Sequence, residues 1–134
     1  MKIEDVIRWA KSHIDGAISQ LAAIGQQLQG EPHEVLAAVE RSNGMFSAAG
    51  DLKVWQHVLS IVEGGATVDD LVDELATYAV HGASRIPGSS SFTSNRYEQE
   101  CTRAYAEVYR DLKRRLDSAR KQAEARQHAS GAPA

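Results

Sequence analysis

The feature that most constrains the fold is a long apolar pattern in the last third of the sequence. From Tyr97 onward, apolar residues recur at steps of three and four, which places them on one face of an α-helix. They are Tyr97, Cys101, Tyr105, Val108, Leu112, Leu116, Ala119 and Ala123. We predict a helix of about nine turns that ends near Gln127. Because a helix in a protein gains most of its stability from packing against other elements, other helices must cover this apolar face.

A second regular pattern opens the chain. Its apolar residues follow a heptad through four repeats, namely Ile3, Ile7, Ala10, Ile14, Ala17, Leu21, Ile24 and Leu28. Val6 and Ile18 widen this stripe, which favours a helix packed in a bundle over a free coiled coil. The same heptad leaves a homodimer open.

Three shorter helices are predicted between these two. The first covers residues 32–42 and is ended by Asn43-Gly44, since both residues tolerate positive φ. Its inward-facing side chains are expected to be Val35, Leu36 and Val39.

Residues 45–50 are interpreted as a short apolar connector to the next helix, for which Asp51 is the expected N-cap. That helix ends at Gly64-Gly65, and its inward side chains are expected to be Leu52, Trp55, Val58, Leu59 and Val62. The following helix opens at Thr67-Val68 and closes before a serine-rich loop.

The predicted fold class is therefore all-α, a compact bundle of about five helices with its long first and last helices packed side by side. Period-two alternation typical of strands is missing from the sequence. A chain of 134 residues fits one domain. We expect that domain to span residues 1–127, with residues 128–134 as a disordered tail.

Charge is distributed unevenly along the chain. Residues 1–84 hold 5 Lys/Arg against 12 Asp/Glu, whereas residues 85–134 hold 10 against 6. No apolar run approaches the roughly 20 residues needed to cross a bilayer, so no membrane association is predicted. The first residues lack the pattern of a secretion signal, and the single cysteine, Cys101, favours a reducing compartment. We expect a cytoplasmic protein.

The basic residues of the last helix are regularly placed. Five of them fall within a band of about 40° at 100° per residue, namely Arg96, Arg103, Arg110, Arg114 and Lys121. We call them the basic ridge; it suits a phosphate backbone or an acidic protein surface. Acidic residues interleave with it, which is also typical of a solvated helix face.

Two further candidate contacts lie outside the ridge. The loop from Arg85 to Arg96 combines hydroxyl side chains with a helix N-terminus, an arrangement that suits an anion or serves as a plain connector. Trp9 stands outside the heptad stripe and is either a partner contact or a packed side chain.

The sequence gives little support for a metal site or a catalytic site. The acidic pairs Glu31/Glu34 and Asp70/Asp73 would suit Mg²⁺ if their helices faced each other, but acids in a first helical turn are favoured by the helix dipole alone. The five histidines show no ligand spacing and are expected at the surface or at helix ends. We predict no catalytic residues, no metal and no cofactor.

The function predicted from these patterns is that of a non-enzymatic binding protein. We expect a small regulator or inhibitor that docks on a larger protein assembly, a class common among bacterial, plasmid and phage accessory proteins. A first alternative is nucleic-acid binding through the basic ridge and Arg85. A second is a metal-dependent hydrolase built on the acidic pairs.

Overall fold

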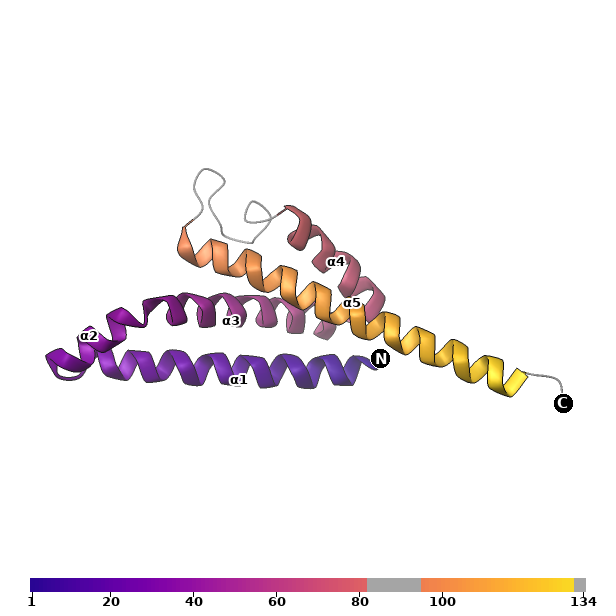
Figure 1. Cartoon of the computed structure of the whole chain (residues 1–134), viewed down its shortest axis with the longest axis horizontal. Coiled ribbons are helices and arrows are strands. Elements are labelled where there is room, and N and C mark those ends of the chain that lie inside the picture. Colours follow the sequence, from indigo (N-terminus) through magenta and orange to yellow (C-terminus); the bar gives the residue numbers. More distant parts are fainter. Residues whose placement is uncertain (82–94, 132–134) are drawn as a thin grey trace.

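The computed structural model describes residues 1–81 and 95–131 and contains five α-helices in that part of the chain (Figure 1). The all-α prediction is confirmed, and the described residues contain no strand. The helices are α1 (Ile3–Leu28), α2 (Pro32–Glu40), α3 (Ser42–Glu63), α4 (Val68–His81) and α5 (Arg96–Gly131).

The third helix lies at the centre of the arrangement. It runs antiparallel to α1 and packs against both α1 and α5, while α4 packs mainly against α5 (Figure 1). The long terminal helices α1 and α5 pack together, as predicted. Their side chains meet where the Arg115 guanidinium lies over the Trp9 ring, 4.2 Å from its centroid.

The main hydrophobic core lies where α1, α3, α4 and α5 converge. The fully covered side chains there include Tyr105, Leu71, Leu75 and Leu112. Toward its other end, α3 packs against α1 and α2, and α5 reaches it at Ser47 and Gly50. The buried residues at that end are small, apart from one isoleucine: Ala17, Ile24, Ala38 and Ala48.

The structure corrects the predicted boundary at Asn43-Gly44. The helix α3 begins at Ser42 and continues through the expected connector, so Asp51 lies within the helix and is not an N-cap. A glycine inside a helix costs only about 1 kcal/mol relative to alanine. Packing against α1 and α5 outweighs that cost.

Gly50 shows why this stretch of α3 carries small residues. A Cβ atom built on Gly50 would lie 2.8 Å from the carbonyl carbon of Glu100 in α5. Such a separation is well inside van der Waals contact, so the two backbones approach each other too closely for any side chain. The close crossing of α3 and α5 therefore depends on this glycine.

The end of α3 agrees with the sequence prediction. The helix stops at Glu63, and Gly65 adopts a φ of 95°, which residues with a side chain rarely adopt. The next helix starts with a capping box, in which the Thr67 hydroxyl accepts from the Asp70 amide and the Asp70 carboxylate accepts from the Thr67 amide.

The last helix departs from prediction at its C-terminal end. It continues to Gly131, four residues beyond the expected boundary at Gln127. Its apolar face is covered only as far as Leu116, because the helix then runs past the end of the bundle (Figure 1). Ala119 is consequently half-buried and Ala123 exposed, whereas the periodicity placed both inward.

Candidate interaction surfaces

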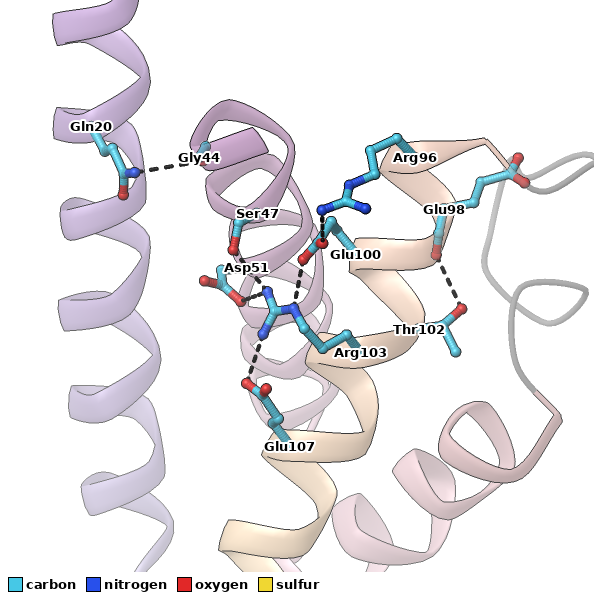
Figure 2. A network of polar contacts seen from close by, with 10 residues as sticks. All are labelled: Gln20, Gly44, Ser47, Asp51, Arg96, Glu98, Glu100, Thr102, Arg103 and Glu107. Atoms are coloured by element: carbon cyan, nitrogen blue, oxygen red, sulfur yellow. Dashed lines mark hydrogen bonds and ion pairs between the residues drawn. The ribbon is translucent and has the colours of Figure 1, made fainter. Parts of the chain in front are cut away.

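Arg103 lies between α5 and α3 and not on a free helix face (Figure 2). Its Nε donates to Glu100 at 2.6 Å, its Nη1 to Glu107 at 2.7 Å, and its Nη2 to Asp51 and to the Ser47 hydroxyl at 3.1 Å each. Burial disfavours the guanidinium charge, but these acceptors outweigh it and raise the pKa of Arg103. This side chain links the two helices, and little of it is left for a partner.

The rest of the basic ridge is more accessible. Arg96 pairs with Glu100 at 3.4 Å and Arg114 with Asp111 at 2.7 Å. Arg110 and Lys121 are exposed and make no ion pair within 4 Å to any described residue. A shallow hollow on α5 contains three of these cations and is lined by Arg110, Lys113, Arg114, Asp117, Ser118 and Lys121.

The sequence analysis singled out the loop from Arg85 to Arg96. Residues 85–94 of this loop lie outside the described part of the chain. Its proposed anion contact at Arg85 is therefore not placed. At its end, the Asn95 side chain accepts from the Glu98 amide at 2.9 Å and caps α5.

Trp9 is half-buried and packs toward α5. The Arg115 guanidinium that covers its ring also donates to Asp111, at 3.0 Å. Of the two roles considered for Trp9, the structure supplies a packing contact within the chain. Whether its remaining exposed part meets a partner stays a prediction.

An apolar surface that the sequence analysis assigned to the core lies at the junction of α1 and α2. Leu36 is 64% exposed and Val39 57% exposed, so the prediction that both face inward is wrong. Ala38 is the buried residue of α2 instead. Leu28, at the end of α1, is 46% exposed. We call Leu28, Leu36 and Val39 the apolar corner.

The backbone around the apolar corner is held by specific contacts. Glu31 and Glu34 form a capping box at the start of α2, and Arg41 donates to Gln27 at 3.0 Å. These bonds fix the turn between α1 and α2, so the apolar corner is presented on ordered helices. The sequence carries no signal for this surface, because an apolar pattern does not show whether a neighbouring helix covers it.

A polar cluster inside the bundle was also missed by sequence reasoning. Nδ1 of His57 and the Tyr105 hydroxyl are hydrogen-bonded at 2.7 Å, and the Tyr78 ring stacks on Tyr105 with centroids 4.8 Å apart. Nε2 of His57 lies 3.9 Å from Glu74. Burial lowers the pKa of His57, only partly opposed by Glu74. The expectation that His57 is a surface or helix-end residue is wrong.

Cys101 is fully buried, as the sequence predicted. Burial raises the pKa of its thiol, and burial likewise raises the pKa of neighbouring Tyr97 to about 12. Because the thiolate is the nucleophilic form, this environment suits a packing role for the cysteine.

The acidic pairs do not come together. Glu31 and Glu34 cap α2, Asp70 caps α4, and these two helix starts lie at opposite ends of the bundle (Figure 1). Within residues 1–81 and 95–131, no group of three or more potential ligands has the geometry to hold a metal ion. The four carboxylates suggested for a hydrolase therefore do not form one site.

Comparison with known proteins does not assign the chain to a family. No family model matches the chain, and neither curated proteins nor solved structures gave a match. Among the helices of the described residues, none is long and apolar enough to cross a membrane.

Proposed function

We propose that the protein is a non-enzymatic binding protein, a small regulator or inhibitor that docks on another protein through its apolar corner. The observation that carries this proposal is the exposure of Leu28, Leu36 and Val39 on ordered helices. Exposed large aliphatic side chains on adjoining helices with polar residues beside them are typical of docking sites.

The arrangement of α2 supports the same proposal. Leu36 and Val39 are three residues apart and share one face of the helix, as the anchors of helix-mediated docking sites do. Glu31, Glu34 and Glu40 supply carboxylates along the same short helix. An apolar centre with a charged rim favours a protein partner over a small molecule, for which an enclosed pocket is usual.

The test is affinity capture of the tagged protein from its native cells at low and high salt, performed with three chains. They are the wild type, L36D/V39D, and the control Q56D/S60D, which adds the same charges at exposed positions of α3. We expect one protein to co-purify in constant ratio with the wild type and the control, and to be lost with L36D/V39D.

Circular dichroism of each variant establishes that the helices are retained. A wild-type chain that captures no protein at either salt concentration contradicts the proposal. So does a partner that L36D/V39D retains in full.

A further inference from the structure

The C-terminal end of α5 has few packing contacts with the rest of the described residues. Leu116 is its last large apolar residue, and the described side chains from Asp117 to His128 are exposed except for Ala119. Figure 1 shows this end projecting beyond the other helices. A helix that is polar all round is stabilised by pairs on its own surface or serves to bridge to something else.

This projecting end carries a positive charge excess. Between positions 110 and 126 there are seven Lys/Arg and three Asp/Glu. Asp111 is already paired with Arg114 and Arg115, and Arg120 pairs with Asp69 of α4. Among the described residues, Arg110, Lys121 and Arg126 have no carboxylate within 4 Å.

The accessible cations form a straight row. At 100° per residue, Arg110, Arg114 and Lys121 lie within about 40° of one another, and the helical rise spreads them over about 16 Å. With Lys113 they line the shallow hollow on α5. We call these four residues the exposed basic row.

We propose that the exposed basic row binds duplex DNA through its phosphate backbone, without reading sequence. Phosphate binding needs accessible cations and releases counterions, and it requires no apolar anchor. An acidic protein partner would need such an anchor, because protein interfaces are built around an apolar centre. The projecting end has none, so its chemistry favours a nucleic acid.

The shape and charge of the remaining molecule fit this assignment. A single projecting helix fits the major groove of B-form DNA, which is about 12 Å wide. Residues 1–84 hold seven more acidic than basic residues and repel phosphate. DNA is therefore directed to the projecting end of α5 and away from α1 and α3. This proposal is independent of docking at the apolar corner.

The test is fluorescence anisotropy of a labelled duplex of about 24 base pairs, titrated with the full chain at 50 to 200 mM salt. With three phosphate contacts, we expect the affinity to fall about 40-fold over this range. R110E/R114E/K121E should weaken binding at least about tenfold at the lowest salt. The matched control is K2E/R8E/K11E, which makes the same charge change at exposed positions at and just before the start of α1 and should stay within about threefold of the wild type.

Three results would overturn the proposal. The first is binding that is undetectable at 50 mM salt or does not change with salt. The second is equal weakening by the two triple variants, which would show that net charge alone matters. The third is equally tight binding of a polyglutamate of matched charge, which would assign the exposed basic row to an acidic protein. Circular dichroism checks each fold, and R110Q/R114Q/K121Q replaces the charge-reversal variant if that variant does not fold.

Discussion

The two ends of α3 differ in the size of the side chains that are buried around them. Around Val54 and Val58, the helices α1, α4 and α5 all supply large side chains, and both valines are fully buried. Toward the start of α3, the helices α1 and α2 lie beside it and α5 reaches Ser47 and Gly50, and the buried side chains there are mostly alanines. The apolar corner lies at the end where the buried side chains are small.

The difference shows that helical periodicity predicts the apolar face of a helix but not the burial of that face. Leu36 and Leu75 both belong to apolar stripes of their helices, yet one is 64% exposed and the other fully buried. The stripe identifies the face of a helix that is apolar, but a neighbouring helix has to be present to cover that face. An apolar face that none of the described helices covers is a candidate contact for another molecule.

The largest expected effect is a difference in unfolding free energy between two Leu→Ala substitutions, one at each end of the bundle. Leu75→Ala should lower the free energy of unfolding by about 2–5 kcal/mol, because it leaves a cavity among fully packed side chains. Leu36→Ala should change the free energy of unfolding by less than about 0.5 kcal/mol, since little buried contact is lost. Urea unfolding followed by circular dichroism measures both. Similar losses of unfolding free energy in the two variants would contradict the proposed difference between the ends.

A smaller effect concerns the ion-pair network that joins α3 to α5. Arg103→Met should lower the free energy of unfolding by about 1–2 kcal/mol, a range reduced because the Arg103 side chain is 34% exposed. Arg110→Met removes the same charge at an unpaired, exposed position of α5 and is the matched control, expected within about 0.5 kcal/mol. Equal effects of the two substitutions would show that the network adds nothing to stability.

The smallest expected effect is a pH dependence of the unfolding free energy, caused by His57 in α3. Because the pKa of His57 is lowered on folding, the unfolded chain binds more protons below its ordinary value of 6.5. The folded state should therefore lose stability as pH falls from about 6.5, relative to His57→Gln. The groups facing His57 are Glu74, Lys53, Tyr78 and Tyr105. Unfolding curves of both chains at pH 7.5, 6.5 and 5.5 measure the difference, and parallel pH profiles would refute this role for His57.

Much of the fold was predictable because local patterns and packing agree. The apolar spacing of α1 and α5 and the glycines after Glu63 each specify an element that the structure contains. The boundary at Asn43-Gly44 failed because two residues that favour turns are overruled by the packing of α3 against α1 and α5. The reason for Gly50, a close crossing with a helix fifty residues away, cannot be read from neighbouring residues.

The candidate surfaces were predictable only in part. The charges of the basic ridge could be read from the sequence, but the burial of Arg103 depends on where α3 lies. The exposure of Leu36 and Val39 was hidden for the opposite reason, since nothing in α2 itself shows that no helix covers it. Whether either surface meets a partner is decided by the experiments above.

The projection of α5 has a consequence for how the two proposed surfaces work together. The apolar corner lies at one end of an elongated molecule and the exposed end of α5 at the other (Figure 1). Ligands at such separated positions do not compete for space. Binding at one end should therefore leave the affinity at the other end unchanged, and one protein could hold both molecules at once.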